Sequence, residues 1–309
     1  MKLGISISNF SFPVPPHELG GAVTHVARAA DAAGIDSLWV MDHFFQIGIT
    51  GEPPEAPMLE GYSTLAYLAG QTERVTLGTC VSSVAYRHPG VLIKIVTSLD
   101  VLTGGRMVLG VGAGAPWNEL PAGIEPRDVE IGGLGIPFPS LAERFERLEE
   151  LLQIAHQMWA GDERPYEGRH YQLSRPLNSP NALQRPHPPI MIGGSGEQKT
   201  LRLVAQYADA CNLFDLPGTG FRDDLKHKLD VLRKHCRDVG RDVDEIEITT
   251  ATAFDLGDDP VAGRRTFLAH LRDLRDLGVH HAIVSPRGPW NETTLDAVTA
   301  LVDDVHALA

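Results

Sequence analysis

The sequence predicts an α/β protein of the (β/α)8 barrel class, and three observations support this prediction. Eight short runs of β-branched or other apolar residues recur along the 309-residue chain. Stretches with helical periodicity lie between these runs. Strand and helix alternate eight times from one end of the chain to the other. Such alternation is typical of a parallel sheet, and eight units in one chain most economically close into a barrel.

The candidate strands are short and rich in β-branched or apolar residues. They are residues 3–8, 36–43, 75–83, 107–112, 189–194, 210–214, 246–254 and 281–285. The clearest helical stretches are residues 25–34, 141–159, 199–209, 223–240 and 263–278, and residues 295–309 end the chain with a similar pattern. Gly34, Gly240 and Gly278 close three of these stretches, as glycines that end helices do.

Two segments interrupt this rhythm, residues 115–139 and 162–188, and both are rich in Pro and Gly. They are far longer than usual connections between strands and helices. We therefore predict a single domain over residues 1–309 with long inserted loops at the C-terminal strand ends, acting as a lid or as a small excursion packed on the barrel. The first segment leaves the fourth strand at its carboxyl end, which is the active-site end of a barrel.

The composition limits the partners and the compartment. A net charge of −13 argues against a nucleic-acid or anionic-membrane surface, which needs clustered Lys and Arg. Cys80, Cys211 and Cys236 are an odd number without C-x-x-C spacing, so neither a disulfide framework nor a zinc ribbon is indicated. The sequence shows no signal-peptide core and no apolar run long enough for a membrane span. We expect a cytoplasmic enzyme without a metal site.

The stretch LGVGAGAPWNE, residues 109–119, tests whether the chain binds a dinucleotide. Gly110, Gly112 and Ala115 fit the G-x-G-x-x-G/A spacing. A dinucleotide turn, however, opens a helix at once and belongs to the first strand–helix–strand unit. Here Pro116 and a long loop follow the fourth strand. The glycines are better explained by close approach of the strand to a neighbour or a ligand.

Four segments taken together are specific: residues 86–119, 136–154, 166–173 and 185–212. In this order they resemble the luciferase-like monooxygenase superfamily, and more closely its deazaflavin branch that depends on coenzyme F420. The resemblance covers residues 1 to about 285. It implies a (β/α)8 barrel with the cofactor ring in the mouth at the C-terminal strand ends, and it implies a homodimer.

Asp42 and His43 end the second strand, where polar groups of a barrel face a ligand. A charged and a titratable residue closing an apolar strand favour a functional site. The resemblance implies an acid–histidine pair here, with the histidine beside the reactive carbon of the deazaflavin, where it accepts or donates the proton that accompanies hydride transfer. We predict both residues as catalytic and Asp42 also as cofactor-binding.

The resemblance places further cofactor contacts on the third and fourth strands. Cys80 and Val81 match the position of a bulged strand with a non-prolyl cis peptide that backs the ring, and we expect the Cys80 thiol itself to act as a small buried apolar group. Gly112, Ala113 and Asn118 match the chain that lines the cofactor.

Gly193, Gly194, Ser195 and Gly196 follow the fifth strand and precede a helix that begins near Lys199. Free backbone N–H groups and a helix N-terminus make an anion site, and related proteins place the cofactor phosphate here. We predict these glycines and Ser195 as phosphate-binding and Lys199 as cofactor-binding.

Four other charged positions have simpler interpretations. Glu197 stands where a serine-hydrolase elbow needs its last glycine, so that enzyme class is discounted. Arg87 and Arg106 are predicted to pair with acids or carbonyls at strand ends. Arg202, with Lys199, is a candidate for the rim that meets the anionic tail of the cofactor.

One departure from the family concerns the substrate. In the glucose-6-phosphate dehydrogenase of this branch a glutamate and a tryptophan stand at the positions of Ala115 and Ile47. Their absence makes sugar-phosphate oxidation doubtful and favours hydride transfer on a less polar substrate.

We therefore predict an F420-dependent oxidoreductase acting on an unidentified small organic substrate. One alternative is an FMN-dependent monooxygenase of the same fold, which uses reduced flavin and oxygen. Another is a non-catalytic carrier of the deazaflavin, which needs no cavity beside the reactive face. A metal-dependent barrel hydrolase lacks support because the sequence has neither H-x-H on a strand end nor H-E-x-x-H.

Overall fold

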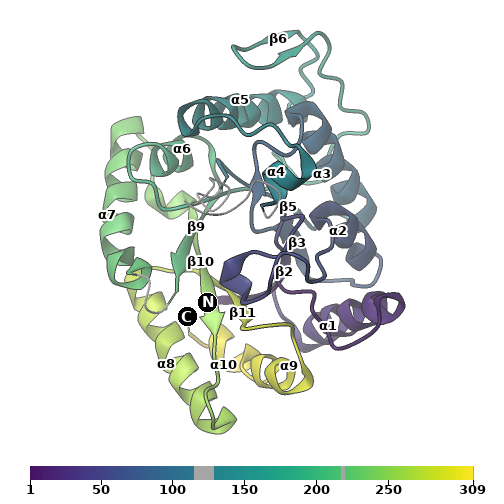
Figure 1. Ribbon diagram of the computed structural model, residues 1–309. Helices are drawn as coiled ribbons and strands as arrows, with labels where there is room; N and C mark the ends of the chain where they lie inside the picture. Colours follow the sequence, from purple (N-terminus) through teal and green to yellow (C-terminus); the bar gives the residue numbers. More distant parts are fainter. Residues whose placement is uncertain (115–128, 217–219, 309) are drawn as a thin grey trace.

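Eight parallel strands close into a barrel, as the alternation in the sequence predicts (Figure 1). The computed structural model describes residues 1–114, 129–216 and 220–308. The barrel strands, in chain order, are β1 (Lys2–Ile7), β2 (Ser37–Val40), β3 (Thr76–Thr79), β5 (Met107–Gly112), β8 (Ile190–Gly193), β9 (Ala210–Asp215), β10 (Glu247–Phe254) and β11 (His281–Pro286). Their spatial order is β3-β2-β1-β11-β10-β9-β8-β5, and pairing of β3 with β5 closes the ring. The predicted barrel is confirmed.

Helices follow the strands and form the outer ring (Figure 1). They are α1 (Leu19–Ala33), α2 (Gly61–Ala69), α3 (Pro89–Thr103), α5 (Leu141–Trp159), α6 (Thr200–Tyr207), α7 (Phe221–Val239), α8 (Pro260–Leu277), α9 (Glu292–Thr299) and α10 (Val302–His306), and a short helix α4 (Glu130–Leu134) precedes α5. Gly34, Gly240 and Gly278 follow α1, α7 and α8 with positive φ, as predicted for helix C-termini. Helices α2 and α3 are less obvious from the sequence because apolar residues cover more than one of their faces.

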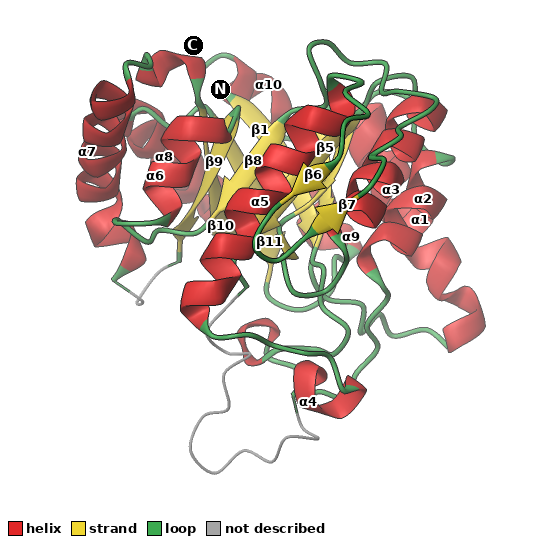
Figure 2. Cartoon of the chain, turned by 90° about the horizontal axis from the view of Figure 1, so that it is seen from above, coloured by secondary structure: helices red, strands yellow, loops and turns green. Residues whose placement is uncertain are grey.

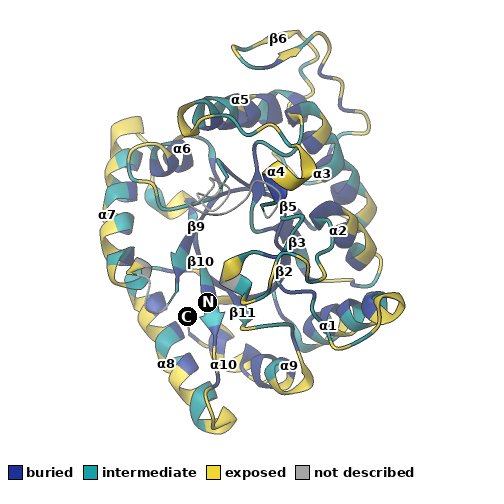
Figure 3. Cartoon of the chain, viewed as in Figure 1, coloured by how far each residue is buried: buried dark blue, intermediate teal, exposed yellow. Residues whose placement is uncertain are grey.

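Each barrel strand has an inner and an outer face. Side chains that fill the lumen form a small cluster contributed by five strands, namely Trp39, Val108, Met191, Ala210 and Ile283. The larger core lies between the strands and the helices, and it includes Leu38 and Val40. Figure 3 shows the buried strands at the centre and exposure on the outward faces of the helices. Because side chains alternate along a strand, neighbouring residues of β2 belong to different layers.

The two ends of the barrel differ. Figure 2 shows α4 and long loops at the end opposite to both chain termini. At the other end, which we call the floor, the Met1 ammonium donates a hydrogen bond to the Leu308 carbonyl (3.0 Å). The end with α4 lies at the carboxyl ends of the strands and is called the mouth.

The prediction for residues 162–188 needs a correction. This segment connects α5 to β8, so it starts and finishes on the amino-terminal side of a barrel strand and not at a carboxyl strand end. It contains a two-stranded hairpin, β6 (Tyr166–Glu167) with β7 (Gln172–Leu173), and packs outside the barrel on α3 and α5. The Glu150 carboxylate of α5 accepts hydrogen bonds from the backbone N–H groups of Arg169, His170 and Tyr171, which fixes the hairpin turn. Of the two predicted alternatives, a lid or a small excursion packed on the barrel, this segment is therefore the packed excursion.

No helix in the described parts of the chain is long and apolar enough to span a membrane.

Candidate active site

Most of the predicted site residues lie on one arc of the mouth. Asp42 and His43 follow β2, Cys80 and Val81 follow β3, Gly112 and Ala113 end β5, and Gly193 to Gly196 end β8. Strands β2, β3, β5 and β8 are consecutive neighbours in the barrel, so the structure brings these residues together. Asn118 lies outside the described residues.

The third strand carries the bulge that the resemblance implies. Gly78 pairs with Val108 and Ser82 of the short strand β4 (Ser82–Ser83) pairs with Val111. Four steps along one strand therefore face three along the other, which leaves one extra residue, a β-bulge. The Cys80–Val81 peptide within it is cis.

The glycines of this arc are required by close packing. A Cβ atom on Gly110 would lie 1.8 Å from the Thr79 carbonyl oxygen. A Cβ on Gly193 or Gly112 would lie 2.8 or 3.1 Å from Cγ2 of Val81. The Val81 side chain therefore occupies the space that larger residues at Gly112 and Gly193 would need. The glycine-rich end of β5 lets strands approach each other, as the alternative to a dinucleotide turn predicts.

Cys80 is not a nucleophile in this environment. Its Sγ lies 3.6 Å from Oδ1 of Asn212 inside the barrel. Burial raises the pKa of the Cys80 thiol to about 12, so the thiol is neutral at physiological pH.

Asp42 faces the helix layer and not the lumen. Along β2 the side chains of Leu38 and Val40 point outward and that of Trp39 points inward, so the alternation directs Asp42 outward and His43 inward. The Asp42 carboxylate is fully buried and accepts two hydrogen bonds from Arg87, at 2.5 and 2.9 Å. The geometry assigns the Asp42 side chain to a salt bridge with Arg87. Its catalytic and cofactor-binding roles remain predictions.

Arg87 closes this network on its other side. Its guanidinium also bonds the Glu60 carboxylate and lies over the ring of Tyr62, 4.7 Å from the centroid. Burial alone would lower the pKa of Arg87, but the hydrogen bond to Asp42 and the charges of Asp42 and Glu60 outweigh burial and raise it. Arg87 is a structural cation that pairs with acids, as predicted. Arg106 likewise donates to the carbonyls of Ala69, Thr72 and Val75.

His43 has an acidic partner that the sequence did not reveal. Nδ1 of His43 lies 2.7 Å from Oε1 of Glu130, the first residue of α4. The other oxygen of Glu130 accepts the backbone N–H groups of Phe44 (2.6 Å) and Phe45 (3.4 Å), and the Tyr86 hydroxyl donates to Oε1. The Glu130 side chain is 1% exposed. One buried carboxylate therefore ties together the segments after β2 and β4 and helix α4.

Glu130 is ionised despite its burial. Burial by itself would raise its pKa, but the hydrogen bonds from His43, Tyr86 and Phe44 and the charge of His43 hold the pKa below its ordinary value. The His43 side chain is 12% exposed, and none of the described residues hydrogen-bonds to its Nε2. The imidazole thus has one nitrogen held by a carboxylate and one available to a ligand in the mouth.

No local signal in the sequence identifies this pairing. Glu130 is 87 positions from His43 along the chain and stands in the segment EIGGLG. Glu130 itself looks like a loop residue in the sequence, whereas it begins a helix and is buried.

The predicted phosphate site has the expected backbone. Gly194 has a φ of 120° and its N–H donates to the Asn212 carbonyl (3.0 Å). The N–H groups of Ser195 and Gly196 have no hydrogen-bond acceptor among the described residues. The Glu197 carboxylate points away to α7, where Lys228 binds it at 2.5 Å. The turn therefore presents unpaired N–H groups without a competing carboxylate.

The two candidate rim cations differ. Lys199 is exposed, and its Nζ lies 5.3 Å from the ring centroid of Phe145. Arg202 reaches Gln206 (3.2 Å) and Glu149 (3.5 Å). Lys199 is the freer of the two for an anionic ligand.

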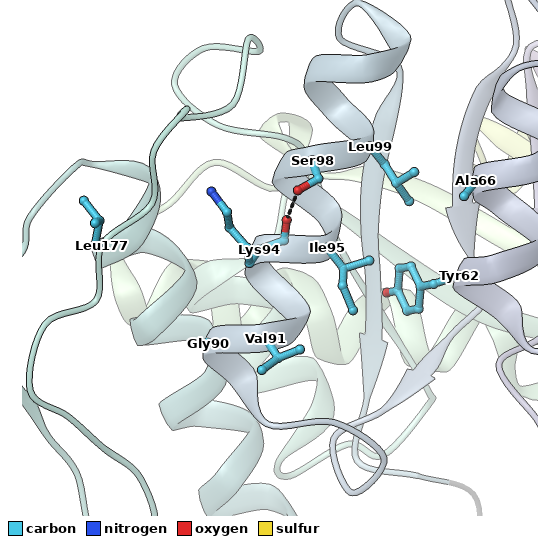
Figure 4. Close-up of a pocket in the computed structure, with 9 residues that line it drawn as sticks. All are labelled: Tyr62, Ala66, Gly90, Val91, Lys94, Ile95, Ser98, Leu99 and Leu177. Atoms are coloured by element: carbon cyan, nitrogen blue, oxygen red, sulfur yellow. Dashed lines mark hydrogen bonds between the residues drawn. The ribbon is translucent and has the colours of Figure 1, made fainter.

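A groove of about 510 Å³ lies elsewhere, on the outer wall between α2 and α3 (Figure 4). It is mostly apolar, and it contains none of the predicted site residues. Its lining residues are Tyr62, Ala66, Gly90, Val91, Lys94, Ile95, Ser98, Leu99 and Leu177.

Comparison with known proteins assigns the family. The sequence pattern of the luciferase-like monooxygenase family matches residues 1–303. The chain belongs to this family.

Two relatives and one solved structure show how this luciferase-like protein compares. It is 35% identical over 184 residues to an F420-dependent glucose-6-phosphate dehydrogenase of Microbacterium testaceum, covering 58% of this chain and 48% of the relative. It is 29% identical over 268 residues to the enzyme of the same name from Kineococcus radiotolerans, covering 84% of this chain and 69% of the relative. The chain thus spans between about half and two thirds of the length of these relatives. An F420-dependent secondary alcohol dehydrogenase, solved with an F420–acetone adduct, superposes with a TM-score of 0.76 at 16% identity over 98% of each chain, which shows the shared fold.

Proposed function

We propose that this protein is a coenzyme F420-dependent oxidoreductase that transfers a hydride between the deazaflavin and a small organic substrate. The observation that carries the proposal is the orientation of His43. The alternation of β2, continued past Val40, directs it to the inner face at the mouth, and its Nδ1 is held by a buried carboxylate while Nε2 hydrogen-bonds to none of the described residues. The names of the curated relatives, both F420-dependent dehydrogenases, support the choice of cofactor.

The residues of the arc fit the cofactor. Val81 packed against Gly112 and Gly193 makes a low wall on which a planar ring can lie, and Cys80 and Ala113 are the chain neighbours of Val81 and Gly112. The N–H groups of Ser195 and Gly196, with Gly194 and Lys199, would hold the phosphate. When bound, the deazaflavin supplies the hydride chemistry.

His43 is the proposed proton-transfer residue. Hydride transfer to or from a neutral substrate is accompanied by a proton, and Nε2 can accept or donate it while Glu130 balances the charge of the imidazolium. A positioned acid–base group of this kind contributes about 10²- to 10⁴-fold to the rate.

We propose a substrate that is less polar than a sugar phosphate. The relatives are named as glucose-6-phosphate dehydrogenases, but Ala115 and Ile47 replace the glutamate and tryptophan that such an enzyme carries. A panel of secondary alcohols, carbonyl compounds and glucose 6-phosphate, followed by F420 absorbance, tests this proposal. Turnover of glucose 6-phosphate as the best substrate would contradict it.

The cofactor proposal is tested by titrating the protein with F420 and, separately, with FMN, following fluorescence. We expect tight binding of F420 and weak binding of FMN. Gly194→Leu should abolish F420 binding because its side chain crowds the phosphate turn, whereas Gly21→Leu, at an open helical position with nothing within 4 Å of its Cβ, should not. Tight FMN binding without F420 binding would favour the monooxygenase, and F420 binding without turnover of any substrate would favour the carrier.

The quaternary state and compartment are also proposals. We propose a cytoplasmic homodimer, as the resemblance implies. Exposed apolar side chains on α3, Val91 (56%) and Leu102 (80%), are candidates for a covered face. Light scattering of the purified protein measures the mass directly, and a monomer would contradict the dimer.

A further inference from the structure

We propose that Glu130 is the positioning residue that fixes His43 as the tautomer with its proton on Nδ1, so that the lone pair of Nε2 faces the mouth. This inference rests on the proposed function for its catalytic meaning. Its structural content, the tautomer, stands without any cofactor.

The tautomer follows from an inventory of donors and acceptors around one carboxylate. Oε2 of Glu130 accepts two backbone N–H groups, those of Phe44 and Phe45. Oε1 accepts the Tyr86 hydroxyl and lies 2.7 Å from Nδ1 of His43. An ionised carboxylate can only accept hydrogen bonds. Nδ1 must therefore carry the proton in this contact, and in the neutral imidazole Nε2 is left as the acceptor.

The carboxylate remains ionised because it is surrounded by donors. Its hydrogen bonds hold the pKa of Glu130 below its ordinary value although burial alone would raise it. The backbone N–H groups of Phe44 and Phe45 can only donate, and the Tyr86 hydroxyl donates as well, so the surroundings of the carboxylate favour its ionised form. The pairing resembles the way buried carboxylates orient histidines in other sites, where they set the tautomer and raise the basicity of the far nitrogen.

The neighbouring acid in the sequence cannot perform this task. Asp42 is next to His43 in the chain, but its carboxylate points into the helix layer and is bound by Arg87. Alternation along a strand sends adjacent side chains to opposite faces. The acid that orients His43 therefore comes from α4, a separate element.

The experiment is a ¹⁵N NMR measurement on the cofactor-free protein labelled at histidine, at a pH where the imidazoles are neutral. The His43 signal is assigned from its loss in His43→Gln. We expect the wild type to show a protonated Nδ1 and an unprotonated Nε2, and Glu130→Leu to shift His43 to the opposite tautomer or to a mixture. Glu130→Gln, which keeps the side-chain shape and an acceptor oxygen, should retain the wild-type tautomer in larger part and serves if the leucine variant does not fold.

Glu146→Gln is the matched control. Glu146 binds another histidine, with Oε2 2.7 Å from Nε2 of His170, and its side chain is 43% exposed. This variant should move the His170 signal and leave that of His43 unchanged.

Activity provides the second measurement once a substrate is known. We expect kcat to fall about 10²-fold in Glu130→Leu and about 10-fold in Glu130→Gln, with KM changed less than about threefold, because the residue acts through His43 and not on the substrate. A wild-type His43 with its proton on Nε2, or a Glu130→Leu protein that keeps both the Nδ1 proton and full kcat, would overturn the inference. Failure of F420 to bind, with the tautomer as expected, would instead overturn the proposed function alone.

Discussion

Two histidines at opposite ends of the barrel each lie beside a carboxylate, but they differ in whether the second ring nitrogen has a partner among the described residues. At the floor, Nε2 of His281 lies 2.8 Å from the Ser37 hydroxyl and Nδ1 lies 3.6 Å from Glu247. At the mouth, Nδ1 of His43 lies 2.7 Å from Glu130, and its Nε2 hydrogen-bonds to none of the described residues. A carboxylate beside a histidine is therefore not in itself a sign of catalysis. What distinguishes the mouth is a nitrogen left available on the lumen side.

Trp39 is the fourth member of the floor cluster, after His281, Ser37 and Glu247. Nε1 of Trp39 donates to the same Ser37 hydroxyl at 2.6 Å, and Ser37 is 1% exposed. A serine, a histidine and a glutamate in a row resemble a nucleophilic triad, but this hydroxyl is buried under Gly4 and already bonded twice. The cluster stabilises the barrel and has no access to a substrate.

The largest expected effect separates the two histidines by activity. His43→Gln should lower kcat/KM by about 10²- to 10⁴-fold because the proton-transfer group is lost. The amide can still donate to Glu130, so the free energy of unfolding should change by less than about 1 kcal/mol. Steady-state kinetics and urea denaturation check both numbers. A variant that keeps wild-type kcat/KM would remove His43 from the mechanism.

Ser37→Ala should have the opposite effect, a loss of stability with little change in kcat. It leaves the Trp39 N–H and the His281 ring nitrogen buried without their shared partner, which costs roughly 1 to 3 kcal/mol of unfolding free energy. The kcat of the folded fraction should stay within about twofold. Thr293→Ala on the exposed face of α9 is the control and should change neither quantity. A loss of kcat without a loss of stability would mean that the floor takes part in catalysis.

The contribution of the floor cluster to the free energy of unfolding should also depend on pH. Burial by itself would raise the pKa of Glu247, but the hydrogen bonds and charges of His281 and Lys2 outweigh it and lower the pKa to about 2. A carboxylate with a depressed pKa stabilises the fold above its unfolded-state pKa and loses that contribution as the pH falls through the folded-state value. Glu247→Gln should therefore be less stable than the wild type by roughly 2 kcal/mol at pH 7. The difference in unfolding free energy between the wild type and Glu247→Gln should become smaller as the pH falls from about 5 to about 2. Urea unfolding across this range measures it, and a gap that is constant with pH would refute the assignment.

The smallest effect is expected at Cys80, which lies in the mouth without taking part in its proton chemistry. With the thiol pKa raised to about 12 by burial, iodoacetamide should not alkylate it in the folded protein at pH 8. Cys80→Ala should retain kcat within about threefold. Rapid labelling, seen by mass spectrometry, would show a reactive thiol and a different environment.

The sequence predicts the barrel well because its signals are local. Strand-forming runs, helical periodicity and closing glycines each depend on neighbouring residues, and all eight strands are present where they are expected. The sequence also contained the signal that separates Asp42 from His43. Alternation from Leu38 onward directs one to the helices and the other to the lumen. The resemblance implies an acid–histidine pair at these two positions, and in this structure the carboxylate hydrogen-bonded to His43 is that of Glu130.

Other features depend on contacts between distant segments. Glu130 stands in EIGGL, whose two glycines disfavour a helix, and packing stabilises α4 in spite of them. Residues 162–188 lie on the amino-terminal side of a barrel strand because they connect α5 to β8. Predicting this location from the sequence requires exact boundaries for the helix and for the strand.

The position of Glu130 has an evolutionary and practical consequence. Connections at the mouth of a barrel are the parts that change most readily when such a scaffold acquires a new substrate. In this protein the connection between β5 and α5 also carries the carboxylate that orients His43. Replacing that connection by one from another enzyme, to alter substrate choice, would remove the partner of the proposed proton-transfer group at the same time. A grafted loop should therefore retain a glutamate at this position, or be selected together with a new acid elsewhere around the mouth.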